Sequence, residues 1–138
     1  MTKIIKPMSY SIISTNNCVF LACEGISSLD EMTAAWREVR GELAEKSLHR
    51  VLVDVTALQS SLDMKELFDL AKLIWQDFPE SGRMALVVRW DQARFAKSLE
   101  MLVRTVGIYL TVFVSEEQAE AWILENAKAT QLVEEFAN

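Results

Sequence analysis

The sequence predicts an α/β domain of the mostly parallel kind, and three observations carry this prediction. Short runs of branched apolar residues recur at a nearly uniform spacing along the 138 residues. Each of the later runs is followed by apolar residues at helical intervals, which indicates a strand and then a helix. The first two runs are joined by an asparagine pair, which is typical of a tight hairpin. We therefore expect right-handed crossovers and a mostly parallel five-stranded sheet with an antiparallel N-terminal edge strand and four or five helices.

The N-terminal part predicts a hairpin and then a helix. Residues 10–15 and 18–24 are two β-rich runs, and Asn16 and Asn17 between them tolerate the positive φ of a tight turn. After Gly25, Ser28 stands three residues before Glu31, which is the spacing of a capping box. Apolar residues then recur at helical intervals to about Lys46, namely Leu29, Met32, Trp36, Val39 and Leu43.

The central strand and the second helix follow. Residues 51–55 have the branched apolar composition of a strand that is covered on both faces. Asp63 is a suitable N-cap with Glu66 at the N3 position, and Leu62 and Leu67 are placed to form a hydrophobic staple. Pro79 ends this helix. Its inner stripe is predicted to be Leu67, Leu70, Ala71, Ile74 and Phe78.

The last elements repeat the alternation. Residues 84–88 and 109–114 are predicted strands, and Ser115 begins a helix with Glu116 and Glu117 in its first turn. Between these strands, Asp91 opens a helix that Gly107 ends. The predicted inner residues of that helix are Phe95, Leu99, Leu102 and Val106, and those of the final helix are Trp122 and Ile123.

Length and charge restrict the class of protein. A chain of 138 residues with 51% hydrophobic residues predicts one domain over residues 1–138, with a core at about 10–124 and a helical tail at 125–138. The net charge of −6 argues against nucleic-acid binding, which needs a basic surface. No apolar run approaches the ~20 residues that span a bilayer, and the N-terminus lacks the apolar core of a signal peptide. We expect a cytoplasmic protein.

The cysteines and the histidine offer little chemistry. On a strand, Cys18 and Cys23 point to opposite faces and lie about 16 Å apart, whereas a disulfide needs Cα atoms within ~7 Å. We expect two buried free thiols. His49 is the only histidine and has no cysteine or aspartate cluster around it, so neither a zinc site nor a cofactor is expected. No nucleophile stands beside a base, and we expect no enzymatic activity.

The run "RVLVDVTAL" with its serine-bearing turn and helix, together with the closing run "YLTVFVSEEQAEAWI", resembles the STAS fold in its SpoIIAA-like branch. This is the family of anti-sigma-factor antagonists, and the resemblance covers about residues 10–124. It implies that a serine at the start of the second helix is phosphorylated by a partner kinase, which switches partner binding. In "QSSLDMKEL", however, there is no glycine, and the family's phosphoserine position falls on or near Asp63. The same fold occurs in CRAL-TRIO-like domains that hold lipids.

Two interpretations of the turn remain open. In the first, Asp63 caps the helix and Ser60 and Ser61 satisfy hydrogen bonds of the turn. In the second, Ser60 or Ser61 is phosphorylated at the positive end of the helix dipole, or Asp63 supplies a permanent negative charge there.

Asp54, Arg89 and Trp90 are further candidates, because they are predicted at the carboxyl ends of neighbouring strands, where open α/β sheets bind ligands. With Ser60 they would form a small crevice for an anionic or aromatic group. The alternative is that backbone donors hold Asp54 and that Trp90 packs on Phe95.

Two surface features suggest binding. Residues 83–104 contain five basic and two acidic residues, whereas the rest of the chain has nine basic and eighteen acidic residues. This span includes Arg94 and would suit an acidic partner or an anionic head group, or it is simply a solvated helix face. On the second helix, Phe68, Lys72 and Trp75 form a second stripe that suits an interface or the wall of an apolar pocket.

These observations favour a non-enzymatic regulatory or protein-interaction domain of STAS type, without the standard phosphoserine switch. The alternative is a carrier or sensor of a small apolar or anionic ligand, such as a fatty acid or lipid, in a pocket between the second and third helices and the sheet. The second stripe and the tail "LVEEF" at residues 132–136 also predict a homodimer, because so short a helix must pack on something.

Overall fold

The computed structural model describes residues 6–59 and 62–125, and it contains the predicted five-stranded sheet in the order β1-β2-β3-β4-β5. β1 pairs antiparallel with β2, and every later neighbour is parallel. The mostly parallel sheet with an antiparallel N-terminal edge is thus confirmed. The strands are β1 Ser9–Ser14, β2 Val19–Gly25, β3 Arg50–Leu58, β4 Arg83–Val87 and β5 Tyr109–Phe113; the helices are α1 Leu29–Lys46, α2 Met64–Asp77, α3 Ala93–Arg104 and α4 Glu116–Ile123, with a 3₁₀ turn at Trp90–Gln92.

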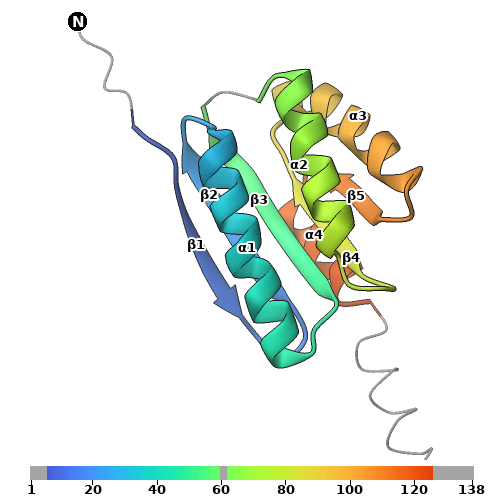
Figure 1. The fold of residues 1–138 in the computed structure, drawn as a ribbon. Helices are drawn as coiled ribbons and strands as arrows, with labels where there is room; N and C mark the ends of the chain where they lie inside the picture. Colours follow the sequence, from blue (N-terminus) through green and yellow to red (C-terminus); the bar gives the residue numbers. More distant parts are fainter. Residues whose placement is uncertain (1–5, 60–61, 126–138) are drawn as a thin grey trace, which may run out of the picture.

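The helices cover the two faces of the sheet unequally (Figure 1). Each crossover from β2 to β5 moves one strand in the same direction, so α1, α2 and α3 lie side by side on one face. They bury the main core with residues such as Trp36, Leu43 and Ile74. α4 lies on the opposite face, where Ala119 and Ile123 contact a smaller apolar cluster.

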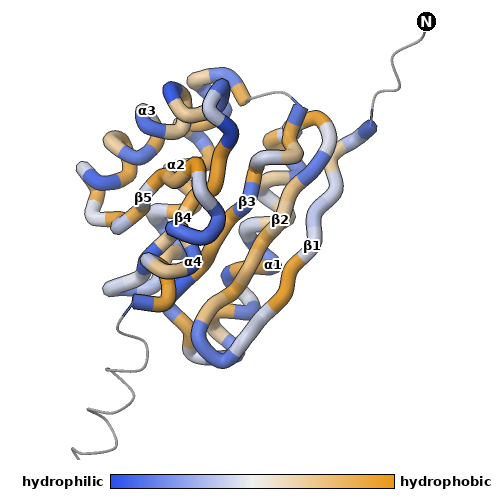
Figure 2. The backbone as a smooth tube through the Cα atoms, turned by 180° about the vertical axis from the view of Figure 1, so that it is seen from behind, coloured by the Kyte–Doolittle hydropathy of each residue, from blue (hydrophilic) through white to orange (hydrophobic). Residues whose placement is uncertain are grey.

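On the face of the sheet that carries α4, called the back face below, the uncovered strands are β1 and β2. α4 lies behind β3, β4 and β5, whereas none of the described helices covers β1 or most of β2 from this side (Figure 2). Ile13 of β1 is accordingly 65% exposed. Arg50 and Arg83 hold the end of α4, since Arg50 Nη1 donates to the carbonyl of Ile123 at 2.7 Å and Arg83 Nη1 to that of Trp122 at 3.4 Å.

The starts of α1, α2 and α4 were predicted correctly from local sequence, whereas α3 begins at Ala93 after the 3₁₀ turn and not at Asp91. Ser28 Oγ accepts from the N–H of Glu31 at 3.5 Å before α1, and Ser115 Oγ accepts from the N–H of Gln118 at 3.2 Å before α4. These caps join residues only three positions apart, so their pattern is visible in the sequence.

The sequence placed the end of the third strand too early. β3 continues past Val55 to Leu58, so Asp54 lies in the middle of the strand and not at its end. After Val55 the chain is no longer a branched apolar run, yet β2 still pairs with it through Ala57 and Leu58. Backbone pairing with a distant strand, and not local composition, decides this boundary.

The predicted inner face of the third helix is partly wrong. The residues that α3 buries are Ala96 and Val103, whereas Phe95 is more than a third exposed. Val106 lies beyond the helix, which ends at Arg104 before Gly107 adopts a φ of +91°. Leu99 and Leu102 of the predicted set do pack against the core, and the exposed Phe95 also lines the cavity beneath the helices.

Cys18 and Cys23 are buried free thiols, as predicted. Cys18 belongs to the cluster beneath α4, and Cys23 belongs to the core beneath α1, so the two side chains lie on opposite faces of β2. Burial raises the pKa of each thiol to about 12.

We expect both thiols to resist labelling in the native state, because a buried, protonated thiol is a poor nucleophile. A disulfide-exchange reagent at pH 8 should react with neither cysteine until urea unfolds the protein, and then with both. Rapid native labelling of Cys18 would contradict its placement under α4.

Candidate functional site

The N-terminal end of α2 is built as the sequence predicted. Asp63 Oδ1 accepts from the N–H of Glu66 at 2.8 Å, and Glu66 Oε1 accepts from the N–H of Asp63 at 3.2 Å. This reciprocal pair is a capping box, and it leaves the Asp63 side chain at the surface. Leu62 is buried and lines the cavity described below, which anchors the helix start. The candidate residues Ser60 and Ser61 lie outside the described residues.

An apolar stripe starts beside this cap and continues along the outward side of α2. It consists of Met64, Phe68, Lys72 and Trp75 and is called the α2 stripe below. Met64 is 58% exposed, Phe68 46% and Trp75 52%. The Lys72 ammonium lies 5.4 Å from the centre of the Phe68 ring. The opposite side of the helix is buried through Leu70, Ala71 and Ile74, so α2 is apolar on two sides and packs on only one among the described residues.

Arg89 and Gln92 fasten the end of β3. Because β4 stops at Val87, the last carbonyl groups of β3 have no partner strand on that side. The Arg89 guanidinium donates to the carbonyl of Thr56 and, at 2.8 Å, to that of Leu58. Gln92 Nε2 donates to the carbonyl of Val55 at 2.9 Å, and Gln92 Oε1 accepts from the N–H of Arg89 at 2.8 Å.

Arg89 thus binds the terminal carbonyl groups of β3, a structural role that the sequence did not reveal. Its guanidinium also contacts Asp91 at 3.0 Å, and this hydrogen bond lowers the pKa of the Asp91 carboxyl. Gln92 was missed altogether. The available signal was its position three residues after Arg89, at the start of a helical segment.

Trp90 is the most exposed large apolar residue of the described chain at 82%. So exposed a ring cannot be held by packing on Phe95. Trp90 follows the carboxyl end of β4, and α2 follows the carboxyl end of the neighbouring β3, so both lie at the same end of the sheet. Arg89, next to Trp90, bonds directly to the end of β3.

Asp54 lies elsewhere. Its neighbours Val53 and Val55 line the cavity beneath the helices, so its own side chain points to the opposite face of β3. There its Oδ1 accepts from the N–H of Thr56 at 2.9 Å and from Thr56 Oγ1 at 2.7 Å. It lines a shallow hollow with Ser9, Ser11 and Glu24. The five described strands also follow one another without a reversal of order at which a ligand crevice would form.

Most cations of the basic span have partners within the protein. Arg83 stacks on Trp122, with its guanidinium carbon 5.2 Å from the ring centre. Arg104 and Lys97 both pair with Glu100, at 3.8 and 3.3 Å. Arg94 is exposed on the first turn of α3, and within the part of the chain described here its side chain makes no ion pair. The surface for an acidic partner is therefore smaller than the sequence suggests.

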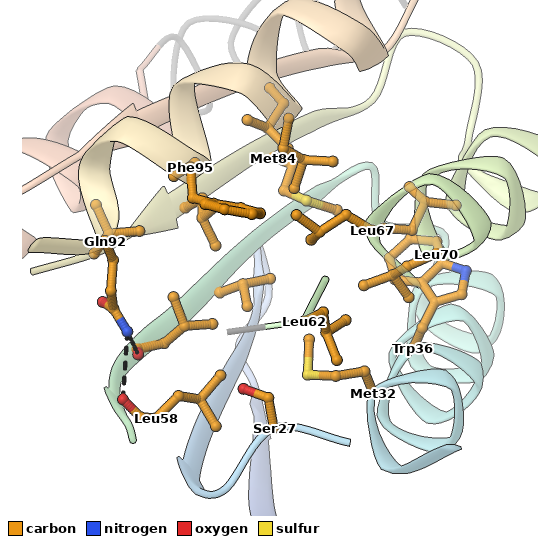
Figure 3. Close-up of a pocket in the computed structure, with 18 of the residues that line it drawn as sticks. Ser27, Met32, Trp36, Leu58, Leu62, Leu67, Leu70, Met84, Gln92 and Phe95 are labelled. Atoms are coloured by element: carbon orange, nitrogen blue, oxygen red, sulfur yellow. Dashed lines mark hydrogen bonds between the residues drawn. The ribbon is translucent and has the colours of Figure 1, made fainter. Parts of the chain in front are cut away.

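An apolar cavity of about 130 Å³ lies between the three helices and the sheet (Figure 3). Figure 3 shows Leu62, Leu67 and Leu70 of the α2 region on one side and Phe95 on the other. Polar groups reach the lining through Ser27 and Gln92. The volume is below the ~300 Å³ of common ligand pockets and close to that of an engineered ~150 Å³ cavity that binds benzene. It therefore suits a small apolar molecule or one end of a longer chain.

Two negative observations apply to residues 6–59 and 62–125. No helix there is long and apolar enough to cross a membrane. No three histidine, cysteine, aspartate or glutamate side chains in these residues are grouped so as to hold a metal ion.

Comparison with known proteins identifies the fold. Neither a protein-family model nor a curated protein matches the sequence. The structure is similar to an anti-sigma factor antagonist from Mycobacterium paratuberculosis, with a TM-score of 0.57, 14% identity, and coverage of 86% of this chain and 96% of that one. It is also similar to an uncharacterised DUF3478-family protein with a SpoIIAA-like fold from Shewanella loihica PV-4, with a TM-score of 0.56, 16% identity, and coverage of 89% and 98%. The chain has the SpoIIAA-like fold, the STAS fold that its sequence resembles.

Proposed function

We propose that this protein is a non-enzymatic, cytoplasmic regulatory domain of STAS type that binds a protein partner through the N-terminal end and the outward side of α2. The observation that carries the proposal is the α2 stripe, which begins beside the Asp63 cap with Met64 and Phe68 and continues to Trp75 in the last turn, leaving all three about half exposed. Exposed aromatic residues next to a charged rim are typical of interface centres. The exposed Trp90 lies at the same end of the sheet as the start of α2 and is a further candidate contact for the partner. The similarity to an anti-sigma factor antagonist agrees with a protein partner.

In this proposal the surface works without the standard phosphoserine switch. The resemblance places the switch position on or near Asp63, whose carboxylate caps α2. A carboxylate at this position is a fixed negative charge at the positive end of the helix dipole. Ser60 and Ser61 are the remaining candidates for phosphorylation.

The interface is tested with a double variant, Phe68→Ser with Trp75→Ser. Proteins captured by the wild-type domain from a lysate of its source cells should be lost with this variant. The matched control is Met101→Ser on α3, because Met101 is 72% exposed and lies outside the proposed surface. Equal capture by all three proteins would contradict the proposal, and so would equal loss from both variants.

Two substitutions of Asp63 separate its role as a helix cap from a role of its negative charge in partner binding. Asp63→Ala should lower the free energy of unfolding by ~1 kcal/mol, whereas Asp63→Asn should change it very little, because an amide oxygen still caps the helix. If the partner recognises the fixed charge, Asp63→Asn should nevertheless weaken partner binding. Urea denaturation and a binding titration measure the two effects. A partner whose affinity is indifferent to Asp63→Asn would end the fixed-charge interpretation.

We also expect the isolated protein to form a homodimer that covers the α2 stripe until a partner replaces it. Sedimentation velocity at micromolar concentrations should show a dimer that dissociates in the Phe68→Ser, Trp75→Ser variant and persists with Met101→Ser. A clean monomer for the wild type would contradict the dimer. The tail at residues 132–136, which contributed to this expectation, lies outside the described residues.

A second candidate function is to carry or sense a small apolar ligand, and the 130 Å³ cavity is the observation that favours it. Ala96 lines the cavity, so Ala96→Leu should fill part of it. Native mass spectrometry should then show an apolar adduct on the wild type that Ala96→Leu lacks, and benzene should raise the melting temperature of the wild type but not that of Ala96→Leu. Ala44→Leu on the exposed side of α1 is the control. The absence of both effects in the wild type would exclude this function.

A further inference from the structure

The two edge strands of the sheet, β5 and β1, differ in whether side chains of the protein bind their outward backbone groups. At β5, side chains of α3 occupy the outward backbone groups. Glu100 Oε2 accepts from the N–H of Val112 at 2.8 Å, and Arg104 Nε donates to the carbonyl of Leu110 at 3.0 Å. Arg104 Nη2 also donates to Thr111 Oγ1 at 2.9 Å. These bonds replace those that a further strand would make, so the β5 edge is closed to strand addition.

The β1 edge has no such protection among the described residues. At the hairpin the N–H of Thr15 donates to the carbonyl of Cys18 at 2.9 Å. Because bonding alternates along an antiparallel ladder, Ser9, Ser11 and Ile13 direct their backbone groups toward β2. The backbone groups of the alternate residues therefore point away from the sheet; these residues are Tyr10, Ile12 and Ser14. The strand reads SYSIIS and contains no charge and no proline.

The groove beside this edge is acidic. Glu38, Glu42 and Glu45 of α1 line it together with Ile12 and Ser14, and Lys46 is its one cation. Two contacts fix the carboxylates against β1, since the Tyr10 hydroxyl donates to Glu38 at 2.9 Å and Ser14 Oγ donates to Glu42 at 2.7 Å. Hydrogen bonds from Ser14 and Lys46 lower the pKa of Glu42, which keeps it ionised.

The face of β1 that points away from α1 carries different side chains. Ile13 is largely exposed there, and Ser11 lies next to it along the strand's open face. Glu24 and Asp54 line the adjoining hollow and add further negative charge. An extended segment along β1 would thus meet the α1 carboxylates with one set of alternate side chains and the exposed Ile13 beside Ser11 with the other set, while Glu24 and Asp54 lie further in on that face.

We propose that the free edge of β1 binds an extended basic segment of a partner protein as a sixth strand. Its lysine or arginine side chains alternate with apolar ones; the basic set faces Glu38, Glu42 and Glu45, and the apolar set faces Ile13. Main-chain bonds to Tyr10, Ile12 and Ser14 supply the register. A second copy of this chain suits the edge less well, because an antiparallel β1 pair would bring two rows of α1 carboxylates together. This surface is separate from the α2 stripe, so the inference does not rest on the function proposed above.

The probe is a fluorescent synthetic peptide in which lysine and valine alternate, and its control has the same composition with the lysines grouped at one end. The alternating peptide should bind at least about 10-fold more tightly in fluorescence anisotropy. In amide hydrogen exchange, the N–H groups of Tyr10, Ile12 and Ser14 should slow on binding, whereas those of Ser11 and Ile13 are already slow in the free protein. Peptide binding without this alternate protection would overturn strand addition.

A charge variant completes the test. A triple variant should lower the affinity for the alternating peptide by about 10-fold or more, and it should make that affinity less dependent on salt concentration. The variant combines Glu38→Gln, Glu42→Gln and Glu45→Gln. The matched control changes the same charge on α4, with Glu116→Gln, Glu117→Gln and Glu120→Gln, and should bind as the wild type does. Equal weakening in both variants would overturn the acidic groove as the binding surface. Alternate protection of β1 in the absence of peptide, rising with protein concentration, would identify a second copy as the occupant and would likewise overturn the proposal.

Discussion

Gly25→Ala is expected to lower the free energy of unfolding by about 3 kcal/mol, from backbone strain and overpacking combined. Gly25 ends β2 with a φ of +90°, a region that L-residues with a side chain rarely adopt. A Cβ there would also lie 2.9 Å from the carbonyl carbon of Pro7 and 3.0 Å from the carbonyl oxygen of Lys6. The neighbouring backbone cannot simply withdraw, because the N–H of Ile26 donates to the Lys6 carbonyl at 3.1 Å.

The matched control, Gly41→Ala, is expected to change the free energy of unfolding in the opposite direction. Gly41 lies inside α1, and a Cβ at this position would meet nothing within 4 Å. Gly41→Ala should therefore raise the free energy of unfolding by about 0.5 to 1 kcal/mol, since alanine loses less backbone entropy in a helix. Urea denaturation followed by circular dichroism measures both. If Gly25→Ala were as stable as the wild type, the path of residues 6–8 beside Gly25 would be wrong.

Arg89→Ala should cost about 2 kcal/mol, because it removes a charged donor from two main-chain carbonyl groups at the end of β3. The Thr56 carbonyl then loses its donor, and the Leu58 carbonyl keeps only the long 3.4 Å bond from Gln92 Nε2. Arg89→Lys should recover only part of the loss, because a single ammonium cannot reproduce the guanidinium fork. Arg94→Ala, on the exposed first turn of α3, should stay within about 0.5 kcal/mol of the wild type.

A local readout distinguishes this account from general destabilisation. The N–H of Gln59 donates to the carbonyl of Gly25 at 2.7 Å, just beyond the part of β3 that Arg89 holds. Its amide exchange should accelerate in Arg89→Ala more than that of Val53 in the middle of the strand. An Arg89→Ala protein whose stability and exchange matched those of Arg94→Ala would contradict the proposed fastening of β3.

The candidate surface was only partly visible in the sequence. Asp63 was identified correctly as the N-cap because its partner Glu66 is three residues away. The exposure of Phe68 and Trp75 was open, since a second apolar stripe equally fits a helix packed on two sides. One interpretation put Asp54 and Trp90 in one crevice, but side-chain alternation along β3 directs Asp54 to the opposite face of the sheet, where the N–H of Thr56 donates to it.

The sequence by itself determined the order of the elements, the direction of the strands and the starts of α1, α2 and α4, because these depend on hydrophobic period and on caps that join residues within one turn. Tertiary structure alone decided how far β3 extends, which side of α3 is buried, and which sheet edge is closed. Each of these depends on groups that are distant in the chain, such as Arg89 on Leu58 and, at the closed β5 edge, Glu100 on Val112. The energy of such contacts exists only after the chain has brought them together, so no local pattern in the sequence records them.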